Sequence, residues 1–263
     1  MSQQGYQYEE NAAKKLASLK CSTGATAGAS HDRPDLELKL ATPKSKIVGC
    51  ELKITATAAG SLVMKYTDGK WYLGDTKDDP EKLLLQDVAK KYKILEMVKK
   101  MWGKKVPYMQ NYANGQKYVT INDRVKAYEL DMEQFGGRNE PRIPIDAIKI
   151  CDYYTAKKCD YINVGTHGFY LLNTKDGLGL NKKIQSLGGV AIPHFSKSTK
   201  AEVRVRCQYK KVGDYQFVMT MEFKGVIKSP YNIAPVISKD NVTIDVKKLN
   251  IKENKLLLAA FRK

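Results

Sequence analysis

Three charged residues in the first quarter of the chain have the types and spacing that metal-assisted hydrolysis requires. They are Asp35 and the outer members of the triplet Glu51-Leu52-Lys53, with fifteen residues between the two acids. Alternate residues of a strand point to one face, so Glu51 and Lys53 are expected side by side. A short turn would bring Asp35 beside them on the neighbouring strand. Two carboxylates suit a hard cation such as Mg²⁺, and a lysine can orient a metal-activated water or stabilise developing charge.

The Glu-x-Lys spacing by itself is not specific, because it occurs four times. The four pairs are Glu37/Lys39, Glu51/Lys53, Glu222/Lys224 and Glu253/Lys255. One of them, Glu51/Lys53, combines an apolar strand with an upstream Asp at a spacing that suits a neighbouring strand. Charges in the middle of an apolar strand require a compensating role, since burying them is costly. The alternative is an ordinary strand face on which both charges contact water.

Periodic patterns predict the elements that position these residues. Apolar residues recur at helical spacing over residues 6–20, and leucines alternate with charged residues from Leu36 to Leu40. A second strand is expected over residues 47–54. Asp68-Gly69 then marks a tight hairpin turn.

A long basic helix is expected after this hairpin. Asp79 is a suitable N-cap, Pro80 suits the first turn, and Gly103 ends a helix that runs to about residue 102. Its polar face carries lysines, of which Lys90 and Lys93 are candidate contacts to a phosphate backbone.

The last hundred residues are expected to be rich in β-structure. The segments 201–209 and 215–223 flank a turn and predict a hairpin. Arg204 and Arg206 share one face of the first strand. They are candidates to follow a phosphate backbone or to read base edges. A solvated sheet face explains them equally well.

The order of these elements resembles the core of the PD-(D/E)XK, or restriction-endonuclease-like, nuclease superfamily. That order is a helix, a small-residue loop, an Asp strand, a Glu-x-Lys strand, a hairpin and a basic helix. The local resemblance, over roughly residues 5–75, is to archaeal Holliday-junction resolvases and to phage and restriction endonucleases. It implies an α/β fold: a restriction-endonuclease-like core, with a mixed sheet flanked by helices, and a β-rich C-terminal extension.

The resemblance also implies the members of a metal site. Asp35, Glu51 and the backbone carbonyl of Leu52 would bind Mg²⁺ or Mn²⁺, and Glu9 of the first helix would complete the site. Lys53 would be the catalytic lysine. We therefore expect the three acids and this lysine to carry the catalysis.

The chain departs from the resolvases in two respects. It is about twice as long as such a core, and the loop from Gly24 to Arg33 is longer, so specificity for a DNA junction does not transfer. Ser22 and Thr23 correspond to the loop of the resolvases. A phosphate contact and a plain loop role both fit these two residues.

The charge of the chain indicates a polyanionic partner. Lysine and arginine total 45 against 28 acidic residues, which gives a net charge of +17. Clustered basic residues gain affinity for nucleic acids through counterion release. A soluble protein from a lysine-rich proteome is the alternative. Five cysteines, an odd number with no C-x-x-C pair, predict reduced thiols in a cytoplasm, the host's if the gene is phage-borne. No apolar run is long enough for a membrane span, so no membrane partner is expected.

The expected organisation is a nuclease core in residues 1–105, a connecting region in 106–159 and the extension in 160–263, a candidate DNA-binding part. The expected function is a Mg²⁺- or Mn²⁺-dependent DNA endonuclease that uses a metal-activated water. One alternative is an RNA endonuclease with the same core that uses Mn²⁺ and His31, because some viral cap-snatching enzymes have an upstream histidine ligand. The other is a basic nucleic-acid-binding protein without catalysis. The sequence leaves a homodimer open.

Overall fold

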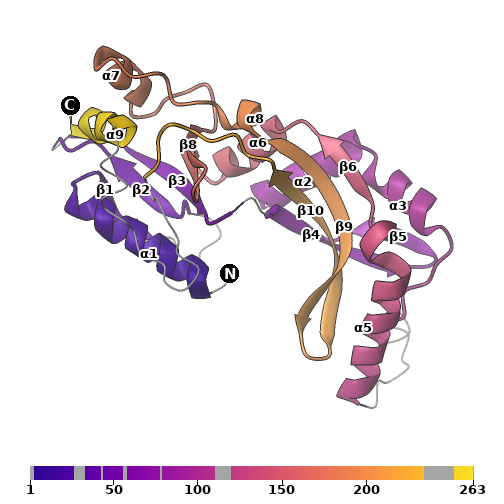
Figure 1. Cartoon of the computed structure of the whole chain (residues 1–263). Coiled ribbons are helices and arrows are strands. Elements are labelled where there is room, and N and C mark those ends of the chain that lie inside the picture. Colours follow the sequence, from indigo (N-terminus) through magenta and orange to yellow (C-terminus); the bar gives the residue numbers. More distant parts are fainter. Residues whose placement is uncertain are drawn as a thin grey trace. The chain divides into compact units, whose positions relative to one another are not determined.

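The computed structural model describes residues 3–26, 33–42, 44–55, 58–77, 79–109, 120–233 and 252–262. The chain divides into two compact units. Figure 1 shows its helices and strands, coloured from the N-terminus to the C-terminus. The first unit comprises Met1–Thr57, Ala147–Lys200 and Phe223–Lys263, and the second comprises Ala58–Asp146 and Ala201–Glu222. The chain leaves the first unit twice and returns twice, so both units are built from segments distant in sequence.

The first unit contains a five-stranded mixed sheet with the order β1-β2-β3-β7-β8. Neighbouring strands are antiparallel except β3 and β7, which are parallel. The strands are β1 (Ser22–Thr26), β2 (Leu36–Lys39), β3 (Ile47–Lys53), β7 (Cys159–Val164) and β8 (Gly168–Leu171). The helices are α1 (Gln3–Ser18), α6 (Ile148–Ala156), α7 (Leu180–Ser186), α8 (Phe195–Ser198) and α9 (Lys252–Arg262).

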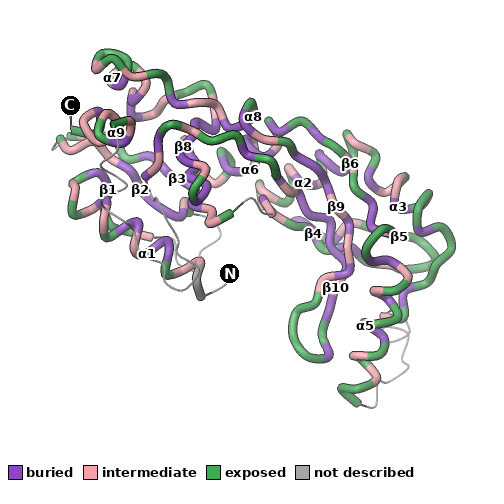
Figure 2. Tube along the Cα trace, in the orientation of Figure 1, coloured by how far each residue is buried: buried purple, intermediate pink, exposed green. Residues whose placement is uncertain are grey.

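Strand β3 is the middle strand of this sheet, and its two faces differ in character. Val48, Cys50 and Leu52 belong to a hydrophobic core that also includes Tyr8 and Leu16 of α1. The residues between them point to the opposite face, because side chains alternate along a strand. The five residues from 48 to 52 are buried, as the continuous buried trace of this strand in Figure 2 indicates.

The second unit contains a five-stranded sheet with the order β5-β4-β10-β9-β6. The strands are β4 (Ala58–Thr67), β5 (Lys70–Leu73), β6 (Arg142–Ile145), β9 (Lys200–Lys211) and β10 (Asp214–Lys224). The helical elements are α2 (Pro80–Lys91), α3 (Ile94–Trp102), α5 (Ile121–Phe135) and the 3₁₀ turn η1 (Gly137–Asn139). Its core holds four aromatic rings whose centroids lie between 4.8 and 6.0 Å apart: Trp71, Trp102, Phe135 and Phe217.

The expected α/β class is confirmed, and so are several local elements. The Asp79 side chain accepts hydrogen bonds from the Glu81 and Lys82 amides, and Pro80 begins α2 as expected. The prediction of one helix from residue 80 to 102 is wrong. Lys93 has φ of 53° and separates α2 from α3, because a residue in the left-handed region cannot continue a right-handed helix.

The C-terminal part of the chain is less uniform than expected. Residues 160–263 supply most of β7 and the strands β8 to β10, but also α7, α8 and α9. The two units do not follow the predicted boundaries near residues 105 and 159 either. Hairpin β4–β5, predicted as part of the core, belongs to the second unit because β4 pairs with β10, about 150 residues later in the chain.

Candidate active site

The register of β2 and β3 brings Asp35 to Glu51. Leu36 lies opposite Cys50 in this antiparallel pair, so the preceding residue, Asp35, is carried next to Glu51. The Leu52 amide donates a hydrogen bond of 2.9 Å to Asp35 Oδ2, which fixes the orientation of this carboxylate. The turn between β2 and β3 thus brings the two acids together, as their spacing in the sequence predicts.

Lys53 lies between the two carboxylates. Its Nζ forms an ion pair with Glu51 Oε1 and lies 3.8 Å from Asp35 Oδ2. Glu51 is fully buried and Asp35 is 3% exposed. The structure therefore brings together the three side chains that the sequence singles out, on the face of β3 opposite the hydrophobic core.

A second lysine, absent from the sequence prediction, completes this cluster. Lys157 follows α6, and its Nζ lies 3.0 Å from Glu51 Oε2. The Tyr154 ring lies beneath both ammonium groups, with its centroid 5.6 Å from Lys53 Nζ and 5.9 Å from Lys157 Nζ. Each oxygen of Glu51 thus has its own cation. No local motif marks Lys157, because only the parallel pairing of β3 with β7 brings it to the site.

Glu9 of α1 lies within electrostatic reach of this cluster. It is 4% exposed, and its Oε2 atom is buried without a hydrogen-bond partner among the described residues. Burial, together with the nearby negative charge of Asp35, raises the pKa of Glu9 to about 8. Glu9 is therefore largely protonated at neutral pH, although no spacing in the sequence indicates this state.

The charges of the cluster shift one another's protonation. Burial and repulsion by Glu51 raise the pKa of Asp35 to about 6, against the opposing effect of Lys53. Burial alone would raise the pKa of Glu51, but the ammonium groups of Lys53 and Lys157 outweigh burial and lower it. The pKa values of both lysines are raised, because attraction to Glu51 and Asp35 exceeds the effect of their burial. At neutral pH, two carboxylates therefore face two ammonium groups.

The chemical nature of these groups fits a divalent cation. Asp35, Glu51 and the unpartnered oxygen of Glu9 are the hard oxygen donors that Mg²⁺ and Mn²⁺ take. Within the described ranges, however, no three side chains of His, Cys, Asp or Glu are grouped closely enough to hold one ion. Both oxygens of Glu51 also contact lysine ammonium groups, so a bound metal would have to displace at least one of these contacts. Leu52, whose carbonyl is the remaining candidate ligand, lies on β3 between Glu51 and Lys53.

Ser22 and Thr23 lie on strand β1 and not in a loop. The Ser22 hydroxyl accepts a hydrogen bond of 3.0 Å from the Gly24 amide, and Thr23 Oγ1 donates one of 2.9 Å to Glu37. Ser22 is buried and Thr23 is exposed. These contacts give both hydroxyls a role within the sheet edge. His31, the candidate ligand for an RNA endonuclease, lies outside the described residues.

The predicted basic contacts all lie in the second unit. Lys90 and Lys93 are exposed, and their ammonium groups lie 3.9 Å from Asp87 and Glu96 respectively. Pairs of this kind on a helix surface contribute little to stability and leave the lysines accessible. Lys90 and Lys93 thus remain candidates for contacts with a polyanion.

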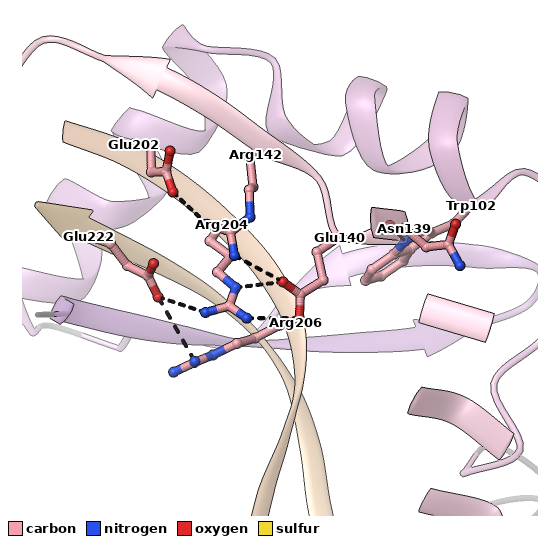
Figure 3. Close-up of polar contacts among 8 residues, drawn as sticks. All are labelled: Trp102, Asn139, Glu140, Arg142, Glu202, Arg204, Arg206 and Glu222. Carbon is pink, nitrogen blue, oxygen red and sulfur yellow. Dashed lines mark hydrogen bonds and ion pairs between the residues drawn. The ribbon is translucent and has the colours of Figure 1, made fainter. Parts of the chain in front are cut away.

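Arg204 and Arg206 have closer partners than expected, as Figure 3 shows. Arg204 donates hydrogen bonds of 2.6 and 3.0 Å to the two oxygens of Glu140. Both arginines also lie within 4 Å of Glu222, at 3.6 and 3.9 Å. Arg142 links Glu140 to Glu202 in the same network. Three arginines therefore balance three glutamates, which makes this sheet face close to neutral.

No family model, curated protein or solved structure was found to match this chain. In the described part of the molecule, no helix has the length and apolar character needed to cross a membrane. The cluster around Glu51 is therefore the feature of this molecule from which a function can be inferred.

Proposed function

We propose that this protein is a nuclease that hydrolyses phosphodiester bonds of DNA with Mg²⁺ or Mn²⁺. The observation that carries the proposal is the convergence of Asp35, Glu51 and Lys53 on one buried patch. The order of the first unit supports it. A helix, three antiparallel strands, a further helix and a strand parallel to the third resemble the core expected of a restriction-endonuclease-like protein.

The charge distribution also favours a polyanionic substrate. The first unit contains 25 basic and 12 acidic residues, whereas the second contains 20 and 16. Most of the positive excess therefore belongs to the unit that holds the carboxylates. A substrate with many phosphates would gain affinity from these lysines and arginines by releasing its counterions.

The residues of the cluster would divide the work as follows. Asp35, Glu51 and the Leu52 carbonyl would hold the cation, with Glu9 completing the set once it loses its proton. A bound divalent cation lowers the pKa of a coordinated water and neutralises charge on the phosphoryl group. Lys53 stays protonated beside the acids, so its ammonium group can contact a phosphate oxygen as negative charge develops there. Lys157 would position Glu51 through its Oε2 atom.

The direct test is cleavage of supercoiled plasmid, single-stranded DNA and single-stranded RNA in EDTA, Mg²⁺ or Mn²⁺. Lys53→Met and Asp35→Asn should lower the rate at least about a hundredfold, the scale of removing one group that stabilises the transition state. Lys14→Met is the control, because Lys14 is exposed on α1 and pairs with Glu10 at 3.4 Å.

Three results would contradict the proposal. Cleavage that survives Lys53→Met unchanged would exclude this cluster as the active site. Salt-sensitive binding without cleavage in any metal would favour a basic binding protein instead. Cleavage of RNA but not DNA would assign the same chemistry to the other substrate. Thermal melting of each variant distinguishes lost chemistry from lost folding.

A further inference from the structure

The second unit contains a cavity that the proposed active site does not use. It has a volume of about 660 Å³, inside the range of roughly 300–1,000 Å³ typical of small-molecule sites. It lies between the β4–β5 hairpin and α3. Its lining residues are Tyr66, Gly69, Lys70, Trp71, Leu95, Glu96, Lys99, Gly103 and Lys104.

The apolar side of this cavity is aromatic and firmly held. Trp71 is 9% exposed and packs against both Trp102 and Phe217, with ring centroids 4.9 Å away in each case. Tyr66 lies edge-on to Trp71 at 5.1 Å and is only partly buried. A planar ring could therefore lie against Tyr66 without rearranging the core beneath it, because Trp71 is already fixed by its neighbours.

The rim of the cavity is basic. Lys70, Lys99 and Lys104 are all exposed, and one acid, Glu96, accompanies them in the lining. The Glu96 carboxylate lies 3.9 Å from Lys93, a fourth lysine just outside the lining. Three ammonium groups around an aromatic wall offer contacts to an anion that also carries a flat ring.

We propose that this cavity binds one nucleotide unit, with its base against Tyr66 and Trp71 and its phosphate near Lys70, Lys99 and Lys104. A nucleotide combines an aromatic ring with a phosphate, so it complements both sides of the cavity at once. An acidic peptide would match the lysines but would leave the aromatic wall without a partner ring. The unit could belong to a nucleic acid strand or to a free nucleotide. The inference does not require catalysis at the first unit.

Tryptophan fluorescence tests this proposal directly, because the chain has two tryptophans and Trp71 lines the cavity. Oligothymidylate or thymidine monophosphate is titrated in EDTA, so that no cleavage can occur. Both are expected to quench Trp71, and Trp102→Phe isolates this signal. Oligothymidylate binding tighter than the monophosphate identifies a strand as the ligand. Equal affinities identify a free nucleotide and still support the site.

Two variants and a matched control separate the cavity from general charge effects. Tyr66→Leu should weaken binding roughly tenfold, the scale of losing one stacked base. Lys99→Ala with Lys104→Ala should weaken it more than Lys126→Ala with Lys210→Ala, which removes the same charge from exposed lysines outside the cavity.

Binding detected by anisotropy of labelled oligothymidylate without any quenching would overturn the proposal. Equal losses in the two lysine pairs would overturn it as well, since they would indicate only a charge effect. Because the assay contains no divalent metal, a failed cleavage assay leaves this result standing, and failure here leaves the nuclease proposal standing. Thermal melting confirms that each variant remains folded.

Discussion

At the scale of single residues, the carboxylate of Glu51 determines the state of its surroundings. Its two oxygens contact two different ammonium groups, those of Lys53 and Lys157, and the side chain is fully buried. A buried charge needs such compensation, because desolvation otherwise favours the neutral form. Glu9 lacks an equivalent partner, and its pKa is raised accordingly. The two glutamates therefore respond to pH in opposite ways.

The raised pKa of Glu9 predicts how stability changes with pH. The folded protein holds this proton up to about pH 8, whereas the unfolded chain releases it near the ordinary value of 4.5. Stability from Glu9 is thus greatest at low pH and falls as pH rises from about 4.5 to about 8. Asp35, raised to about 6, acts in the same direction below that pH, while Lys53, Lys157 and Glu51 keep their charges.

Glu9→Gln should remove this loss, because glutamine stays neutral. Its gain in unfolding free energy over the native protein is expected to be small near pH 5 and larger near pH 9. Urea unfolding in EDTA at both pH values measures the difference. An equal difference at the two pH values would show that Glu9 does not titrate in this range. Glu10→Gln on the exposed face of α1 is the control.

Asp35, Glu51 and Lys53 could be located from the sequence because their positions depend on local geometry. Two adjacent strands and a two-residue spacing are enough to place them together. Lys157 could not be found in this way, because its approach requires a parallel strand pairing after an intervening unit. The shared strand face of Arg204 and Arg206 could also be predicted from the sequence. Their carboxylate partners, Glu222 on β10 and Glu140 before β6, could not.

At the scale of elements, β3 is held closely between its neighbours. Gly49 allows this, since a Cβ atom at its position would lie 2.4 Å from the Lys158 carbonyl oxygen and 2.6 Å from Pro34 Cβ. Pro34 precedes Asp35, so the approach of these segments also sets the position of the candidate ligand. A side chain at Gly49 would separate these segments and displace Asp35, although no charged residue would be substituted.

Gly49→Ala should therefore lower both stability and the proposed nuclease activity. Overpacking of this kind costs about 1–3 kcal/mol, and contact with backbone atoms places it at the upper end. Urea unfolding gives the loss of stability, and plasmid cleavage gives the loss of rate. Gly188→Asn serves as a control for an added side chain without contacts, because a Cβ there meets nothing within 4 Å; its φ of 80° strains an asparagine, so some stability is lost, but less than in Gly49→Ala. Unchanged unfolding of Gly49→Ala would refute the close contact.

At the scale of the whole molecule, each unit has its own core. The first core contains Leu16, Cys21 and Cys50, and the second contains both tryptophans with Phe135. The sequence did not disclose this division, because the second unit is assembled from two insertions and no change in composition marks their ends. Units with separate cores need not unfold in a single step.

Truncating one side chain in each core should therefore shift the unfolding transition reported by a different probe. Phe135→Ala, which removes about 3–5 kcal/mol of packing, should lower the urea midpoint of tryptophan fluorescence. It should shift the urea midpoint for labelling of the Cys21 and Cys50 thiols much less. Leu16→Ala, at about 2–5 kcal/mol, should show the reverse pattern. Mass spectrometry of labelled peptides follows the thiols. Equal shifts of both probes in both variants would indicate one cooperative unit.

Lys157 is translated long after Glu51, and this order has a consequence for the nascent chain. Glu51 and Lys157 are separated by 106 residues, which a ribosome adds in roughly 5–20 s. During that interval Lys157 is not yet made, so of its two cations Glu51 has Lys53 alone. Glu51 can gain its second cation only after the whole of the second unit's first segment, Ala58–Asp146, has been translated. Translation thus sets the order in which this cluster gains its two cations.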